Sequence, residues 1–453
     1  MNRSKQPMPA QAPIINLGTP ITHILPNGLT LLIVENHKLP QVSLRLSLDE
    51  PPTLERNKKG VYDLISLLAG SGSTSIPKDE FNEEIDYLAA DISILPNGVS
   101  AQMLSKYFPR VLELIADAAL HPNFEEEEME REKARIIQSL RANENNAEAI
   151  SKRVQQTLRF TTAHPYGEYI TEKNVKALIL KDVHQYYHTH FVPNNAYLVI
   201  TGDVHPAEVY RLVSRYFGEW QAVSTPQETL YVPENVPETQ INLIDLPNAV
   251  QSEIRITNLI DLQMNDPDYF AMLIANSILG GDFGSYINMN LREANGYTYG
   301  ASSYFKTDKW TKGVFSIKTS VGNAVTAPAV IETLKEVKRI RCEAVSKEKL
   351  AQAKAQYLGQ FVLATERPQT IANYAINIKA RQLSPYFYKN YIANINAVTK
   401  EDVQRVAEKY FQLNQMRIIV VGKKDEVLKD LESATFEGEK LPVYLFDSYA
   451  NQL

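Results

Sequence analysis

The chain has 453 residues, of which 44% are hydrophobic and 22% charged, an ordinary composition for a globular protein. Its net charge of −6 gives no basic footprint for nucleic acid, and no apolar run approaches the roughly 20 residues that span a bilayer. Cys342 is the one cysteine, which excludes an intrachain disulfide framework and a zinc cluster built from cysteines.

Residues 1–15 are polar and proline-rich, and we expect them to form a flexible arm. They contain no apolar segment of the kind that defines a signal peptide. Such a start resembles the trimmed mature end of an exported protein. We therefore expect a bacterial periplasmic location in preference to a cytoplasmic one.

The first half of the chain predicts a mixture of strands and helices. Pro26-Asn27-Gly28 and Pro96-Asn97-Gly98 are turn signals that predict two hairpins. Residues 42–48 alternate between apolar and polar side chains, which predicts a strand with one buried face. Apolar spacing of three and four predicts a helix over residues 60–69. Further helices are expected at 78–90, 109–120, 124–140, 148–160 and 183–191, and a strand at 196–201.

Residues 219–239 contain Pro226, Pro233 and Pro237 and few periodic apolar positions, which predicts a linker. A second unit follows it. Its expected strands are 241–244, 252–256, 314–319 and 416–421, and its expected helices are 269–279, 327–339, 346–361, 370–380 and 403–411.

The two units share a helix-strand pattern. Asp182-Val183, Phe191, Asn194 and Gly202 recur as Asp402-Val403, Phe411, Asn414 and Gly422, displaced by a constant 220 positions. We therefore predict an α+β protein of two similar domains, each a largely antiparallel sheet packed with helices. These domains are expected at residues 16–218 and 240–453.

Several stretches together resemble the pitrilysin/insulinase family of zinc peptidases, which includes mitochondrial processing peptidase and the core proteins of the cytochrome bc complex. They are Leu25 to Leu29, Gly60 to Thr74, His164-Pro165-Tyr166-Gly167, Asp182 to Gly202, and Leu279-Gly280-Gly281 through Leu291 to Tyr299. They occur in the order found in the family and span nearly the whole chain. The resemblance implies the family's fold.

The resemblance also locates a degenerate zinc site. Family members carry H-x-x-E-H on a helix, with two histidine ligands and a glutamate base, and a distant helix supplies a glutamate ligand. The histidine positions here are Asp63 and Leu67, the base position is Ser66, and the distal ligand falls near Ser139. Leucine offers zinc no lone pair and serine is too weak a base at neutral pH. We therefore expect no catalytic residue and no metal on this chain.

The second half retains the spacing of a substrate-binding pair. In the family an arginine and a tyrosine seven residues apart hold the substrate near the zinc of the opposite half. Arg292 and Tyr299 have that spacing here. Tyr297 is an alternative, because it would share a strand face with Tyr299. The competing interpretation is that Arg292 ends a helix and the tyrosines pack.

Three other patterns invite functional interpretations that we consider less favourable. His184 and His188 have the spacing of a metal site, but a surface or packing role fits better. The acidic run 125–132 lacks the spacing of a calcium loop and predicts a solvated helix start. The glycines of 280–284 precede no Lys-Ser/Thr pair, which excludes a phosphate loop, and a place at the chamber hinge or substrate path is expected for them.

We therefore expect a zinc-free subunit of a two-subunit peptidase. It would close the chamber over a zinc-bearing homologous subunit and present Arg292 and Tyr299 to an unfolded or peptide substrate. The peptide would pair with a strand edge near residues 91–95. The alternative is a structural or peptide-binding scaffold resembling a core protein and associating as a dimer. Hydrolysis by an unrelated mechanism is a third hypothesis, although no Ser/His/Asp or Cys/His pattern stands out.

Overall fold

The computed structural model describes residues 20–70, 72–224 and 228–453. The arm expected at residues 1–15 lies outside these ranges, and so do residues 225–227 of the expected linker. The described residues between Phe217 and Gln240 form no helix or strand.

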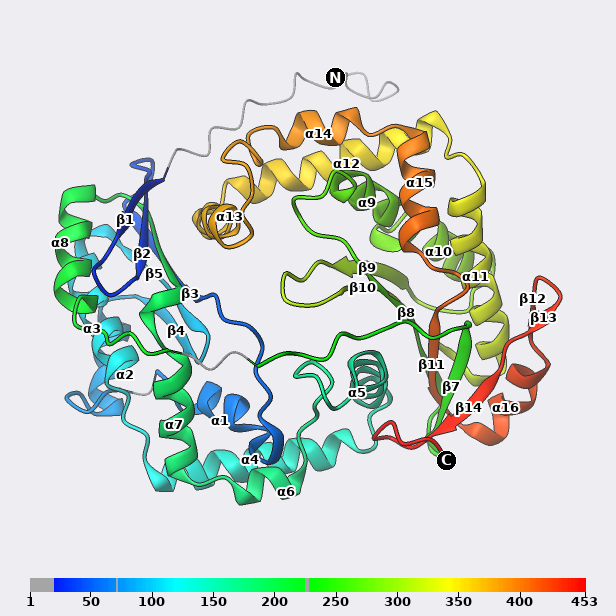
Figure 1. Cartoon of the computed structure of the whole chain (residues 1–453), viewed down its shortest axis with the longest axis horizontal. Coiled ribbons are helices and arrows are strands. Elements are labelled where there is room, and N and C mark those ends of the chain that lie inside the picture. Colours follow the sequence, from blue (N-terminus) through cyan, green and yellow to red (C-terminus); the bar gives the residue numbers. More distant parts are fainter. Residues whose placement is uncertain (1–19, 71, 225–227) are drawn as a thin grey trace.

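The N-terminal half contains a six-stranded sheet with the order β1-β2-β6-β3-β5-β4 (Figure 1). Neighbouring strands run antiparallel except β2 and β6, which are parallel. The strands are β1 (Ile21–Ile24), β2 (Thr30–Glu35), β3 (Gln41–Leu48), β4 (Asp91–Leu95), β5 (Gly98–Leu104) and β6 (Ala196–Gly202). The helices are α1 (Val61–Leu68), α2 (Lys78–Tyr87), α3 (Phe108–Leu120), α4 (Glu126–Asn143), α5 (Ala147–Phe160), α6 (Glu172–Ala177), α7 (Leu180–His190) and α8 (Pro206–Phe217).

The C-terminal half contains a second six-stranded sheet with the order β14-β7-β11-β8-β10-β9. Its strands are β7 (Gln240–Asp245), β8 (Gln251–Ile260), β9 (Ala301–Lys306), β10 (Gly313–Gly322), β11 (Arg417–Gly422) and β14 (Val443–Phe446), and β12 (Thr435–Phe436) and β13 (Glu439–Lys440) form a separate hairpin. The helices are α9 (Tyr269–Asn276), α10 (Tyr286–Asn288), α11 (Thr326–Cys342), α12 (Lys347–Thr365), α13 (Pro368–Ala380), α14 (Tyr391–Ala397), α15 (Lys400–Tyr410) and α16 (Lys424–Ser433).

Five strands of each sheet correspond, which confirms the predicted duplication. Reading from β2 and from β7, the two sheets have the same chain order and the same pattern of one parallel pair followed by antiparallel pairs. The sixth strand differs in origin. In the first sheet β1 is the antiparallel hairpin partner of β2, whereas in the second sheet β14 comes from the end of the chain and runs parallel to β7. The predicted α+β class with largely antiparallel sheets is confirmed.

The two halves exchange one helix each. α5 lies on the face of the C-terminal sheet that is turned toward the N-terminal half, and α13 lies on the face of the N-terminal sheet that is turned toward the C-terminal half (Figure 1). The 220-residue displacement maps residues 147–160 of α5 onto 367–380, so α13 is the repeat equivalent of α5. The apolar contacts are Ile150 and Val154 with Ile244, Ile419 and Val421 under α5, and Ala372, Ala375 and Ile376 with Leu32 and Val199 under α13.

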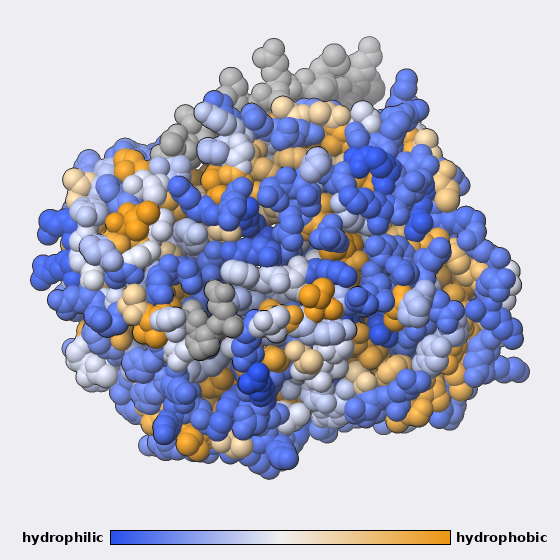
Figure 2. Space-filling model, in the orientation of Figure 1, coloured by the Kyte–Doolittle hydropathy of each residue, from blue (hydrophilic) through white to orange (hydrophobic). Residues whose placement is uncertain are grey.

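The surface is hydrophilic over most of the face in Figure 2, and its hydrophobic side chains occur in small separate groups. No helix within residues 20–70, 72–224 and 228–453 is long and apolar enough to cross a membrane.

Candidate functional site

The position of the degenerate zinc site is set by how α1 begins and packs. Gly60 precedes the helix with φ of 104°, in the left-handed region that favours glycine. The Glu55 carboxylate accepts hydrogen bonds from the backbone N–H groups of Gly60 (2.9 Å) and Tyr62 (3.3 Å), which caps the helix N-terminus. The stripe Val61, Leu64, Ile65 and Leu68 is buried, as predicted, so Asp63 and Leu67 lie on the exposed face.

The residues on this face do not fit zinc. The Ser66 hydroxyl donates to the Tyr62 carbonyl at 2.8 Å, so it is engaged within the helix. Leu67 is 40% exposed, and Ser139 is exposed on α4, which packs beside α1. Loss of hydration around the Asp63 carboxylate raises its pKa, and the nearby Glu55 adds to the effect. Over the described residues no three His, Cys, Asp or Glu side chains are grouped to hold a metal ion.

The histidine and acidic patterns have structural partners. The His184 ring packs edge-on against Phe124, and its centroid is 6.4 Å from that of His188. In the acidic run, Glu128 pairs with Lys78, and the 7%-exposed Glu132 side chain pairs with Arg135 at 2.9 Å. The expectation of a solvated helix start is therefore wrong at these two positions, because their carboxylates are largely covered and lie in ion pairs.

The glycines at 280–281 have a packing role. They form a π-helical turn, Ser277–Gly281, that packs on β9. A Cβ added to Gly280 would lie 2.7 Å from the backbone nitrogen of Ser303. Close approach of this turn to the strand therefore requires glycine at this position.

Arg292 lies in a second π-helical turn, Met289–Ala294, and its side chain is 38% exposed. Its guanidinium is 4.6 Å from the centre of the Phe283 ring, and Nε is 3.4 Å from the Glu293 carboxylate. Phe283 is itself 62% exposed. The sequence reasoning missed this aromatic platform; its signal was an aromatic residue between glycines in a loop.

The two candidate tyrosines occupy different environments. Residues 295–300 are irregular and β9 begins only at Ala301, so the expectation that Tyr297 and Tyr299 share a strand face is wrong. Tyr297 packs against the C-terminal core, whereas Tyr299 is 93% exposed. Packing therefore explains Tyr297 and leaves Tyr299 without a structural role in the chain.

The comparisons with known proteins agree with this geometry. Residues 33–166 match the family Insulinase (Peptidase family M16), and residues 177–357 match Peptidase M16 inactive domain. The chain belongs to the M16 peptidase family. Among individual relatives, it is 24% identical to the mitochondrial-processing peptidase subunit beta of Rattus norvegicus, over 91% of this chain and 86% of that protein.

Proteins whose names describe them as inactive are also similar to this chain. It is 21% identical to the probable inactive metalloprotease YmfF of Bacillus subtilis, over 84% of this chain and 93% of that protein. Its fold matches an M16 inactive domain from Pseudomonas fluorescens with a TM-score of 0.80 and 20% identity, covering 89% of this chain and 98% of that one. The first half of the periplasmic protease PqqL from Escherichia coli has a TM-score of 0.68 and 16% identity, covering 91% and 93%. An M16 chain without the zinc-binding residues fits a non-catalytic role.

Proposed function

We propose that this chain is the non-catalytic subunit of a two-subunit zinc peptidase. A homologous partner carries the zinc, and this chain closes the chamber and presents Arg292 and Tyr299 to a peptide bound at that zinc. A guanidinium is suited to hydrogen-bonding peptide carbonyls, and a phenol is suited to supporting an oxyanion.

The observation that carries the proposal is the exposure of Tyr299. A tyrosine that is 93% exposed in an irregular segment contributes nothing to the core, and it stands seven residues after a half-exposed arginine. Large exposed aromatic side chains are common where a protein meets a partner or ligand. Every zinc-site residue on α1 and α4 has been lost, so Arg292 and Tyr299 have no zinc on this chain to act with. This favours a site that is shared with a partner.

The free edges of the two sheets differ in a way that supports peptide docking in the N-terminal half. β4 is one of the two edge strands there, at the residues expected from the sequence. On β9, the corresponding edge strand of the C-terminal sheet, Asn288 accepts from the backbone N–H of Ala301 at 3.1 Å, and Asn276 donates to the carbonyl of Ser303 at 3.4 Å. These amides occupy backbone groups that an added strand would need. An extended peptide is therefore assigned to β4.

The test is reconstitution with a zinc-bearing M16 subunit from the same organism. Arg292→Ala and Tyr299→Phe are expected to lower kcat/KM of the pair by about 10- to 100-fold. Tyr297→Phe is expected to change it little because Tyr297 packs, and Tyr386→Phe is a control at another exposed tyrosine. Unchanged activity in both Arg292→Ala and Tyr299→Phe would contradict the proposal. A chain that binds peptides, pairs only with itself and stimulates no peptidase would favour the scaffold alternative.

Metal content gives an independent check. The purified chain, expressed with ample zinc and dialysed, is expected to retain far less than about one zinc per chain by mass spectrometry, because α1 and α4 lack the ligands. About one tightly held zinc per chain would overturn the non-catalytic assignment.

We also propose a bacterial periplasmic location, on the basis of the similarity in fold to a protein described as a periplasmic protease. Fractionation of the source cells tests this, and recovery with cytoplasmic markers would contradict it.

A further inference from the structure

The face of the C-terminal sheet that carries α5 is cationic. Tyr304 and Lys306 on β9 alternate with Phe305, which packs on the core, so both point to the face that carries α5. Lys318 on β10 lies opposite Ser302 of β9 and opposite Arg255 of β8. α5 crosses the same face, where Gln155 donates to Ser316 at 2.8 Å. We call the four cations of this face the basic face: Arg159, Arg255, Lys306 and Lys318.

Arg159 is the unusual member of the basic face. It is only 7% exposed, and its Nε and Nη2 have no acceptor among the residues that the structure describes. These two nitrogens form the side of a guanidinium that binds a carboxylate with two parallel hydrogen bonds. The chain uses them in that way elsewhere. Arg110 binds Glu84 at 2.6 and 2.8 Å, and Arg141 binds Glu172 at 3.0 and 2.6 Å.

The charge of Arg159 is poorly compensated. Burial lowers its pKa to about 10, with Arg255 acting in the same direction and Tyr304 opposing it. The carboxylates of this face serve other groups. Glu148, which is 68% exposed, lies 3.7 Å from Arg255, and Glu253 accepts from Ser320. A buried cation without an anionic partner is costly, so an anion at this position would be stabilising.

A cavity of about 340 Å³ opens beside the basic face and is lined by Tyr304, Lys306 and Arg381 together with Gln356 and Gln360. Within the described part of the chain, Lys306 and Arg381 lie in no ion pair with a carboxylate, and Arg381 donates to the Thr307 hydroxyl at 3.4 Å. Asp282, the acidic lining residue, accepts from Gln356 and from the backbone of Phe283. The cavity therefore offers a ligand two cations, beside one carboxylate whose Oδ1 already accepts from neighbouring N–H groups.

We propose that the basic face and this cavity bind carboxylate groups of a peptide, so that the subunit selects acidic peptides. The carboxylate engages Lys306 and Arg381 in the cavity, and Tyr304, which also lines the cavity, is a neighbour of Arg159. Because the amides of Asn276 and Asn288 occupy backbone groups of β9, the peptide is recognised here by side chains and not by strand pairing. This inference rests on the proposed peptide-binding function and names the class of substrate.

The test measures direct binding of short fluorescent peptides to the isolated full chain by anisotropy. The peptides contain Glu, or Gln at the same positions, and each is made with a free and with an amidated C-terminus. We expect the Glu peptides to bind about tenfold more tightly than the Gln peptides, and the preference to shrink between about 50 and about 300 mM salt. A preference that depends only on the free C-terminus would assign the site to that carboxylate.

Two variants address the residues. One variant is Lys306→Gln, at an exposed position. The other is Arg159→Lys, which keeps the charge but loses the pair of guanidinium nitrogens that can bind one carboxylate together. Each is expected to reduce the preference for Glu at least about threefold. Arg141→Lys is the matched control, because Arg141 lies outside the basic face and both of its corresponding nitrogens already donate to the Glu172 carboxylate. Equal binding of free-acid and amidated Glu and Gln peptides, or an unchanged preference in both variants, would overturn this inference and leave the subunit role standing. Failure of every peptide to bind would also overturn this inference. If, in addition, the reconstituted pair were inactive, the proposed subunit function would fall as well.

Discussion

Leu67 lies one helical turn after Asp63, on the exposed face of α1. A histidine at position 67 would therefore point to solvent on the same side as residue 63. The geometry for a two-ligand helix is therefore present: the two positions lie on the exposed face of α1, and the opposite stripe is buried. The donor chemistry is missing, because leucine has no lone pair and the Ser66 hydroxyl is bonded to the backbone of Tyr62. Four side-chain identities thus remove metal chemistry and leave the fold intact.

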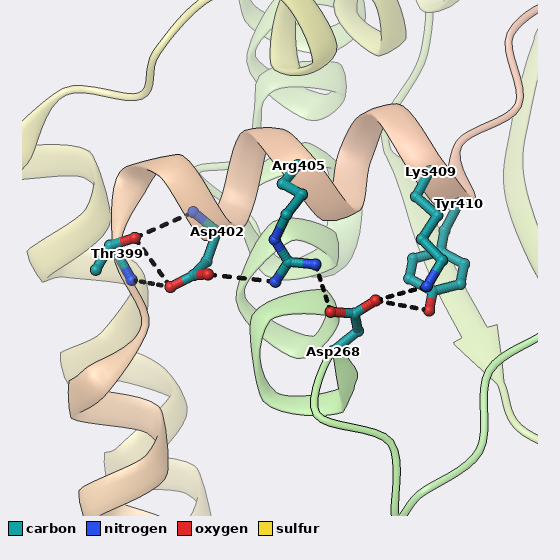
Figure 3. A network of polar contacts seen from close by, with 6 residues as sticks. All are labelled: Asp268, Thr399, Asp402, Arg405, Lys409 and Tyr410. Atoms are coloured by element: carbon teal, nitrogen blue, oxygen red, sulfur yellow. Dashed lines mark hydrogen bonds and ion pairs between the residues drawn. The ribbon is translucent and has the colours of Figure 1, made fainter.

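Asp268 shows a carboxylate used for structure. It precedes α9 and accepts from Arg405, Lys409 and Tyr410, all on α15 (Figure 3). Burial by itself would raise its pKa, but the donors outweigh burial and lower the pKa to about 2. Arg405 also binds Asp402, which caps α15 together with Thr399. The network joins two helices that are far apart in the sequence.

Asp268→Asn is expected to destabilise the protein by about 1–2 kcal/mol at pH 7, measured by urea denaturation. The depressed pKa means that the ionised carboxylate stabilises the folded chain above its unfolded pKa of 3.8, and that this contribution is lost as the pH falls toward about 2. The difference between variant and wild type should therefore shrink below about pH 4. Glu401→Gln is the control, because its side chain is 72% exposed and lies on α15, the helix that carries the partners of Asp268. An undiminished difference near pH 2.5 would contradict the assignment.

At the scale of elements, the π-helical turn Ser277–Gly281 can pack against β9 only because Gly280 has no side chain. The backbone of β9 lies so close to Gly280 that a methyl group would overlap Ser303. β9 was not predicted from the sequence. Its Ser302 and Ser303 have little strand propensity, and the strand is defined by pairing with β10 and by this packing. Local propensity is therefore a poor guide at this edge of the sheet.

Gly280→Ala is expected to cost about 1–3 kcal/mol in thermal or urea denaturation, because the added methyl overpacks the contact with Ser303. Gly359→Ala is the matched control. Gly359 lies within α12 with nothing inside 4 Å of an added Cβ, so the substitution should stabilise the chain by about 0.5–1 kcal/mol. A neutral or stabilising Gly280→Ala would show that the turn and strand are not in close contact in solution.

At the scale of the whole molecule, the exchange of α5 and α13 makes each half complete the other. Each sheet has its own helices on one face and a helix from the other half on the opposite face. The apolar contacts under α5 join Ile150 and Val154 to three strands of the C-terminal sheet. We therefore expect the stability of one half to depend on residues of the other.

Val154→Ala is expected to cost about 1–2 kcal/mol, because it removes buried methyl groups under α5. Hydrogen exchange should then speed up in β11 and β7 of the C-terminal half, although the substitution lies in the N-terminal half. Val209→Ala on α8 is the comparison, since Val209 is equally buried but packs only in the N-terminal core. If both variants changed exchange in the same strands, α5 would not be a cross-half element.

The sequence by itself determined the two hairpins, the buried stripe of α1, the duplication with its 220-residue displacement, and the loss of the zinc ligands. These features rest on turn chemistry, periodicity and residue identity, which act over a few neighbouring positions. Only the tertiary structure decided that α5 and α13 exchange between halves, that Tyr297 packs while Tyr299 is exposed, and that Arg159 is buried without an acidic partner among the described residues. Burial and charge pairing depend on which distant segments meet, and no local pattern encodes that.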